Sequence, residues 1–122
     1  MRLDRRVALG AILVAGAALR LHGIGDVPFG FHPDEAHNAL DALAIGDGWR
    51  PVYLPGNNGR EPLFVYGMAA LQAVLGPTIA AARLTAAVAG WLMIGAQYVF
   101  CCALPLPRPR ATALIAAAIA AT

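Results

Sequence analysis

The part of the sequence best equipped for chemistry is a short polar run between long apolar stretches. His32, Asp34, Glu35 and His37 place two carboxylates and two imidazoles within six positions. Such groups serve as general bases, and carboxylates also bind divalent cations. The run therefore predicts a catalytic or cation-binding site. The simpler alternative is that Asp34 and Glu35 are first-turn acids of a helix, where the positive end of the helix dipole favours negative charge.

A helix over residues 34–45 is predicted to carry these groups, with Pro33 tolerated in its first turn. At helical spacing, one face of this segment is polar and the opposite face is apolar. The polar face holds Asp34, His37, Asn38 and Asp41, and the apolar face holds Ala36, Leu40, Leu43 and Ala44. We expect the apolar face to pack and the polar face to line a cleft. His37 fits either a ligand or an ordinary polar group of a helix surface.

The rest of the chain has the composition of a membrane protein. Of its 122 residues, 59% are hydrophobic and 13% are charged, whereas soluble domains contain about 25% charged residues. Scattered arginines and a net charge of +2 give no basic surface for nucleic acid. Cys101 and Cys102 are adjacent inside an apolar run, which argues against a disulfide between them and against a metal site. We therefore expect an all-α polytopic membrane protein.

Apolar runs define the expected elements of a single membrane domain, residues 1–122. The first transmembrane helix is expected over 7–24, with Arg20 reaching toward the far interface. A helix over 62–75 would rise only about 21 Å, which is typical of a juxtamembrane or re-entrant helix. A second transmembrane helix is expected over 80–104. The run 111–122 is too short to cross a bilayer of about 30 Å, so we expect it to begin a third span of a longer protein.

The basic residues predict the topology. They precede the first helix and follow the second: Arg2, Arg5, Arg6, Arg108 and Arg110. The positive-inside rule places both groups in the cytoplasm. The segment 25–61 holds six acidic residues and two arginines, so we expect it outside the cytoplasm, together with the 62–75 helix. This describes a multi-pass protein of the cell membrane. A cleaved signal peptide, with Ala15-Gly16-Ala17 as its cleavage site, is the competing interpretation of the first helix.

An acidic cleft at the outer membrane face is accessible to water-soluble and to lipid-borne reactants. A carboxylate there can take the proton of a hydroxyl that attacks an electrophilic carbon. The guanidinium groups of Arg60 and Arg83 match the geometry of a phosphate. Arg83 is also consistent with an interfacial anchor, and Asn57 and Asn58 with simple turn residues. Together these groups favour transfer from a phosphate-linked donor that lies in the bilayer.

Four features, in this order, resemble the N-terminal part of GT-C superfamily membrane glycosyltransferases. They are Arg20 at the end of the first helix, Phe31 before Asp34-Glu35-Ala36, the block from Gly56 to Tyr66 (GNNGREPLFVY), and Arg83-Leu84 at the head of the next span. The chain looks most like the bacterial relatives of dolichyl-phosphate-mannose protein mannosyltransferases and of the lipid A aminoarabinose transferase. The resemblance extends over nearly the whole chain.

This resemblance implies a GT-C fold whose first outer loop carries short juxtamembrane helices. It also implies inverting transfer of a hexose or pentose from a polyprenyl-phosphate carrier to a hydroxyl of a protein, lipid or glycan acceptor. Asp34 would be the base or a metal ligand, with Glu35 as the second catalytic residue. Asn58, Arg60 and Arg83 would bind substrate. A divalent cation, the only cofactor expected, would be held by Asp34, His37 and Glu61.

Two functions of other classes are compatible with the same residues. One is a non-catalytic membrane module whose acidic loop binds a cation or a partner protein. The other is a piece of a transporter, which predicts charged residues within its spans. Gln97 is the only strongly polar side chain from Leu84 to Leu104, so the transporter is the weakest of the three hypotheses.

Overall fold

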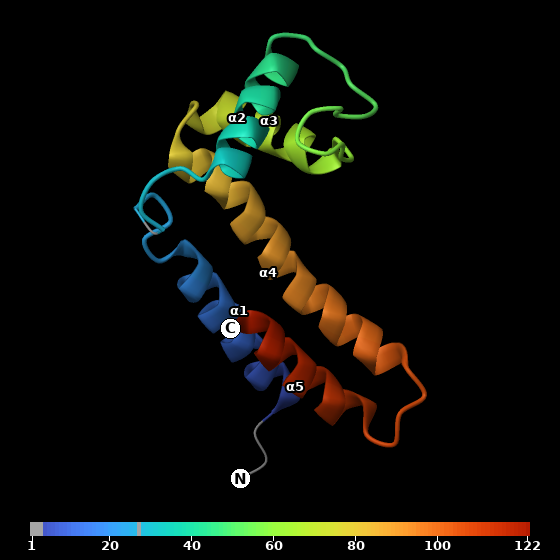
Figure 1. Cartoon of the computed structure of the whole chain (residues 1–122). Coiled ribbons are helices and arrows are strands. Elements are labelled where there is room, and N and C mark those ends of the chain that lie inside the picture. Colours follow the sequence, from blue (N-terminus) through green and yellow to red (C-terminus); the bar gives the residue numbers. More distant parts are fainter. Residues whose placement is uncertain (1–3, 27) are drawn as a thin grey trace. The chain divides into compact units, whose positions relative to one another are not determined.

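The computed structural model describes residues 4–26 and 28–122, so the predicted cytoplasmic position of Arg2 lies outside the described residues. Five α-helices make up the regular structure of these ranges, together with an isolated β-bridge between Leu54 and Arg60. The helices are α1 (Arg5–Leu21), α2 (Pro33–Gly46), α3 (Leu63–Leu75), α4 (Ile79–Ala103) and α5 (Pro109–Ala121) (Figure 1). The expectation of an all-helical chain is confirmed for this part of the protein.

Helix α1 is shorter than the predicted first span. It begins after Asp4, whose Oδ1 accepts a hydrogen bond from the Arg6 amide at 3.1 Å. It ends at Leu21; the next residue, His22, is extended, and Gly23 follows with a φ of +63°. The predicted continuation of this helix to residue 24 is therefore wrong. The 17 residues of α1 rise about 25 Å.

Helix α2 forms where it was predicted, over 34–45, with one more residue at each end. His32 precedes it, and its Nδ1 accepts a hydrogen bond from the Asp34 amide at 3.3 Å. Glu35 Oε2 in turn accepts one from the His32 amide at 3.3 Å. These reciprocal bonds satisfy two amides that the first helical turn would otherwise leave free. Pro33, which has no amide hydrogen, is therefore well suited to begin the helix.

The face of α2 that packs is not the predicted one. Ala39, Ala42 and Ile45 are buried, whereas Leu40 and Leu43 remain 66% and 38% exposed. The rotation of the helix about its axis is fixed by hydrogen bonds from its polar face to the segment that precedes α3. Those bonds turn the neighbouring alanines, rather than the leucines, toward α3. The buried face is thus rotated from the predicted apolar face by about 145° around the helix axis.

The other three helices match the predicted ranges 62–75, 80–104 and 111–122 to within two residues at each end. Helix α4 has 25 residues and is the only described helix that is long and apolar enough to cross a membrane. It rises about 37 Å. Helices α3 and α5 are apolar but have 13 residues each. Length and composition therefore identify one candidate span in the described part of the chain.

The chain divides into two compact units, and α4 contributes to both. The α2–α3 unit comprises Gly23–Ala86 and includes the first turns of α4. The α1–α5 unit comprises α1, α5 and α4 from Ala87 onward.

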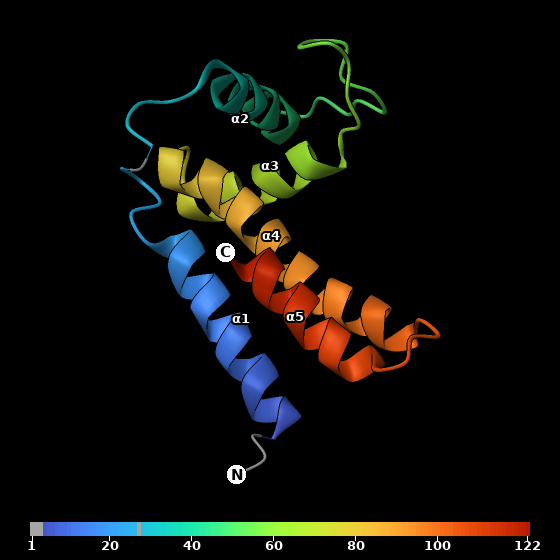
Figure 2. The same ribbon diagram turned by 60° about the horizontal axis from the view of Figure 1, so that its bottom comes forward.

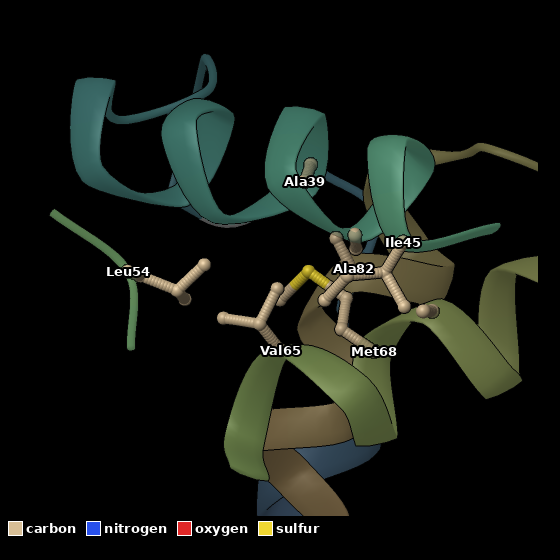
Figure 3. Close-up of a cluster of buried hydrophobic side chains, with 8 residues drawn as sticks. Ala39, Ile45, Leu54, Val65, Met68 and Ala82 are labelled. Atoms are coloured by element: carbon tan, nitrogen blue, oxygen red, sulfur yellow. The ribbon is translucent and has the colours of Figure 1, made fainter. Parts of the chain in front are cut away.

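The core of the α2–α3 unit lies between α2, α3 and the start of α4. It consists of Ala39, Ala42, Ile45, Leu54, Val65, Met68, Ala69 and Ala82. Figure 3 shows Val65 and Met68 pointing from α3 toward α2, with Leu54 beside them. Leu54 is 0% exposed and is the one core residue from the irregular segment between α2 and α3. It therefore anchors that segment to the helices.

In the α1–α5 unit, α1 and α5 lie side by side and run in the same direction (Figures 1 and 2). Arg20, in the last turn of α1, donates hydrogen bonds to the carbonyl oxygens of Ala120 and Ala121 at 2.6 and 2.9 Å. These carbonyls belong to the last turn of α5, where helices leave acceptors unpaired. Helix α4 packs on the pair through Ile94, which is 0% exposed. Arg20 thus joins two helix ends within this unit.

Candidate functional site

The α2–α3 unit contains a cavity of about 210 Å³ to which three of the predicted site residues contribute. Its wall is formed by Asp34, Glu35, Asn38, Phe64, Met68, Ala82, Arg83 and Ala86. Helix α2 supplies the carboxylates, α4 supplies the guanidinium group, and α3 supplies apolar side chains. The cavity therefore combines charged groups with an apolar wall, as ligand pockets do, but it is smaller than the usual volume of about 300–1,000 Å³.

Glu35 and Arg83 form the partly buried ion pair of this cavity. Arg83 Nη2 and Nε lie 3.0 and 3.3 Å from Glu35 Oε2, and the Arg83 side chain is only 8% exposed. The same guanidinium donates to the carbonyl oxygens of Gly30 at 2.6 Å and Ile24 at 3.4 Å. The hydrogen bond from Arg83 lowers the pKa of Glu35 more than burial raises it, and the His32 amide lowers it further. Glu35 is therefore ionised at neutral pH and a weak proton acceptor.

Asp34 has a different environment, although it is the next residue in the chain. Its side chain is 62% exposed, and its Oδ1 accepts a hydrogen bond from Asn57 Nδ2 at 3.0 Å. Its Oδ2 lies 3.5 Å from His32 Nδ1. Among the described residues no arginine contacts it. Asp34 is thus the carboxylate of the cavity wall that is open to an incoming hydroxyl group.

Arg60 links the turn that precedes α3 to the polar face of α2 through hydrogen bonds. Its Nε donates to Asn38 Oδ1 at 2.9 Å, its Nη2 to Asp41 Oδ2 at 2.5 Å, and its Nη1 to the Gly56 carbonyl at 3.1 Å. The backbone amide and carbonyl of Arg60 also pair with those of Leu54, each at 3.0 Å. All three guanidinium nitrogens therefore have protein partners, and the side chain is 18% exposed.

The tip of this turn is formed by Asn57, Asn58 and Gly59, all with left-handed backbone angles (φ of 51°, 68° and 76°). Asparagine and glycine tolerate this conformation better than other residues. The interpretation of the two asparagines as turn residues is therefore confirmed. Asn57 also contacts Asp34, whereas Asn58 is exposed and its side chain bonds to no other described residue. The role of Asn58 in substrate binding stays a prediction.

The residues predicted to hold a metal ion do not lie together. His37 Nε2 is 3.7 Å from Asp41 Oδ2, and Glu61 is exposed and does not line the cavity. Within residues 4–26 and 28–122, no three side chains of His, Cys, Asp or Glu are close enough to hold a metal. Asp34, His37 and Glu61 are thus not a preformed site, and a cation would need ligands from a substrate as well. Their role as metal ligands stays a prediction.

Sequence reasoning missed the pairings that build the site. The sequence puts Asn38 and Asp41 on the polar face of α2 without naming a partner, and it does not predict that Asn57 contacts Asp34. The available signal was charge balance, because an arginine in an acidic segment tends to find a carboxylate partner. That signal does not say which carboxylate is the partner, so the ion pair between Arg60 and Asp41 is known only from the structure.

Comparisons with protein-family models, with curated proteins and with solved structures found no match to this chain.

Proposed function

We propose that the chain belongs to an inverting GT-C-type glycosyltransferase, which moves a sugar from a polyprenyl-phosphate carrier to an acceptor hydroxyl at the outer membrane face. One observation carries this proposal. Asp34, Glu35 and Arg83 line a single cavity together with apolar side chains of α3. These three residues are also among those on which the sequence resemblance rests.

Asp34 is the proposed general base. Its carboxylate is the exposed one, and its bond from Asn57 leaves the second oxygen available for the proton of an acceptor hydroxyl. In an inverting transfer the hydroxyl attacks the anomeric carbon as the carbon–phosphate oxygen bond breaks. The base then holds the proton of the hydroxyl, and the negative charge passes to the leaving phosphate.

Glu35 and Arg83 have supporting roles in this proposal. The low pKa of Glu35 makes it a poor base, and its bonds to Arg83 make it a positioning residue for that guanidinium. A phosphate in the cavity would lie beside Arg83, whose positive charge would stabilise the charge that develops on the leaving group. Because the Arg83 guanidinium already donates to Glu35, Gly30 and Ile24, the phosphate would have to replace one of these acceptors. Arg60 is committed to Asp41, Asn38 and Gly56. It would therefore bind phosphate only if those bonds were exchanged.

The membrane topology is also a proposal, and it is supported by the lengths and directions of the helices. Helix α4 is the candidate span, and the parallel α1 and α5 run opposite to it within the α1–α5 unit. Alternating directions support crossings by α1 and α4 and a third span that begins with the 13 residues of α5, with the N-terminus in the cytoplasm and the α2–α3 unit outside it. Helix α1 rises about 25 Å, which is short of the average hydrocarbon thickness of about 30 Å. Local thinning of the bilayer accommodates such a difference at modest cost.

Substitution of Asp34 tests the proposal. We expect Asp34→Asn, in the protein assayed in its native membranes with a radiolabelled polyprenyl-phosphate sugar, to lower the transfer rate by about 10²–10⁴-fold. Asp47→Asn is the matched control, because Asp47 is an exposed acid of the same unit and lies outside the cavity wall. Unchanged transfer by the Asp34 variant would refute the catalytic role. That result would favour the alternative, a non-catalytic membrane module whose acidic segment binds a cation or a partner.

A further inference from the structure

The α1–α5 unit contains a second cavity, of about 520 Å³, at the end where α1 and α5 begin. It is lined by Arg5 of α1, by Cys102 near the end of α4, and by the five residues from Pro107 to Ala111. The proposed transfer reaction uses none of these residues. The volume is within the range of small-molecule sites, about 300–1,000 Å³.

The charge of this cavity is positive and uncompensated. Three of its lining residues are arginines, Arg5, Arg108 and Arg110, and all three are exposed. In the described part of the chain none of them forms a salt bridge. Asp4, the adjacent acid, caps α1 through the Arg6 amide. Three guanidinium groups from two elements around one hollow attract an anion, because no carboxylate there neutralises them.

The side chains, rather than the start of α5, supply this charge. Pro109 is the first residue of α5 and has no amide hydrogen. The amides of Ala111 and Thr112 donate to the Arg108 carbonyl at 3.1 Å each, so they are occupied. The guanidinium groups therefore supply most of the donors for an anion, beside the amide of Arg110, and their planar geometry matches the oxygens of a phosphate ester.

Neighbouring side chains indicate that this phosphate belongs to a lipid. Val99 and Phe100, within one turn of Cys102 on α4, are 67% and 63% exposed. Because Cys102 lines the cavity and lies near the end of α4, the candidate span, the basic hollow is placed where a membrane-spanning helix would meet the headgroups. We propose that Arg5, Arg108 and Arg110 bind the phosphate of an anionic phospholipid headgroup at the cytoplasmic membrane surface. The proposal needs the α1–α5 unit to lie in a bilayer, but it does not need the transfer reaction.

Lipid retention measures this binding directly. The purified chain in detergent micelles is titrated with phosphatidylglycerol or with phosphatidylcholine, and bound lipid is counted by native mass spectrometry. We expect phosphatidylglycerol to bind and phosphatidylcholine to bind much more weakly. Equal binding of the two lipids would overturn the proposal. Displacement of phosphatidylglycerol by inorganic phosphate would also overturn it, because the site would then take a soluble phosphate.

Arg5 and Arg6 provide a matched pair of variants. Both are exposed residues of the first turn of α1, but only Arg5 lines the cavity. Arg5→Gln is expected to weaken phosphatidylglycerol binding about fivefold, the effect of one basic residue near an anionic surface. Arg6→Gln removes the same charge and should change binding less than about twofold. Equal losses in the two variants would show diffuse attraction instead of a site and would overturn the proposal.

A second pair of variants separates charge from folding. Arg108→Gln with Arg110→Gln is expected to weaken binding about 25-fold if the two effects add, whereas Arg108→Lys with Arg110→Lys keeps the charge and most of the affinity. Lipid binding that is unchanged by the double glutamine variant contradicts the site. Asp34→Asn should leave lipid binding intact, so failure of this inference and failure of the proposed transferase function are distinguishable.

Discussion

Removal of the Arg83 guanidinium is the strongest structural test of the candidate site. Breaking a buried ion pair by deleting one partner costs about 3–5 kcal/mol. The Glu35 side chain is 33% exposed, so water can replace part of the lost interaction. We therefore expect Arg83→Gln to destabilise the α2–α3 unit by about 2–3 kcal/mol, which includes the loss of the bonds to Gly30 and Ile24.

Hydrogen exchange of the α2 amides measures this loss in the intact chain. When the α2 amides exchange through opening of this unit, a destabilisation of about 2–3 kcal/mol makes their exchange about 30- to 150-fold faster. Arg50→Gln is the control, because Arg50 is an exposed arginine of the same unit that donates only to the backbone carbonyls of Ile45 and Trp49. If Arg83→Gln changes α2 exchange no more than Arg50→Gln does, the ion pair does not hold the unit together.

The pH dependence of the same signal has a defined sign. Because the pKa of Glu35 is lowered in the folded protein, the ion pair contributes in full above the ordinary pKa of a glutamate. Its contribution is lost as the pH falls through the lowered value. The extra α2 protection of the wild type over Glu35→Gln should therefore be constant at neutral pH and disappear in acid. A difference that grows toward low pH would contradict the cause assigned to the shift.

Two further predictions concern packing. A Cβ added at Gly16 would lie 2.6 Å from Ile94 Cδ1, whereas one added at Gly10 meets nothing within 4 Å. Gly16→Ala should therefore lower the free energy of unfolding by about 1–3 kcal/mol, and Gly10→Ala should raise it by up to about 1 kcal/mol through helix propensity. Thermal unfolding followed by far-ultraviolet circular dichroism compares the two variants. Equal effects would contradict the close packing at Gly16. Leu54→Ala should cost about 2–5 kcal/mol and expose its loop to limited proteolysis. Val52→Ala, at a position 93% exposed, should do neither, and a loop equally resistant in both variants would contradict the anchoring role of Leu54.

The helices could be predicted from the sequence because their signals are local. The capping pair of α2, His32 and Glu35, is three residues apart, and Pro109 begins α5. The end of α1 was placed too late, because hydropathy continues through Ile24 while the backbone turns at Gly23. Hydropathy reports which residues avoid water, and it does not report where a chain stops being helical.

The rotation of α2 about its axis and the different environments of Asp34 and Glu35 could not be predicted. Both depend on contacts with residues distant in the sequence. Arg60 sets the rotation through Asn38 and Asp41, which lie 22 and 19 residues earlier. Glu35 meets Arg83 across 48 residues. From the sequence, Asp34 is the expected base or metal ligand and Glu35 the second catalytic residue, but the partner of neither can be named. The structure separates them, because only Glu35 has a buried arginine partner.

The location of position 34 tests the central claim most directly. With Cys101→Ser and Cys102→Ser as the background, Asp34→Cys introduces one thiol at a position whose native side chain is 62% exposed. We predict that a membrane-impermeant maleimide labels this thiol in intact cells, as an active carboxylate at the outer membrane face requires. Labelling that occurs only after the membrane is permeabilised would place the residue on the cytoplasmic side and contradict the account.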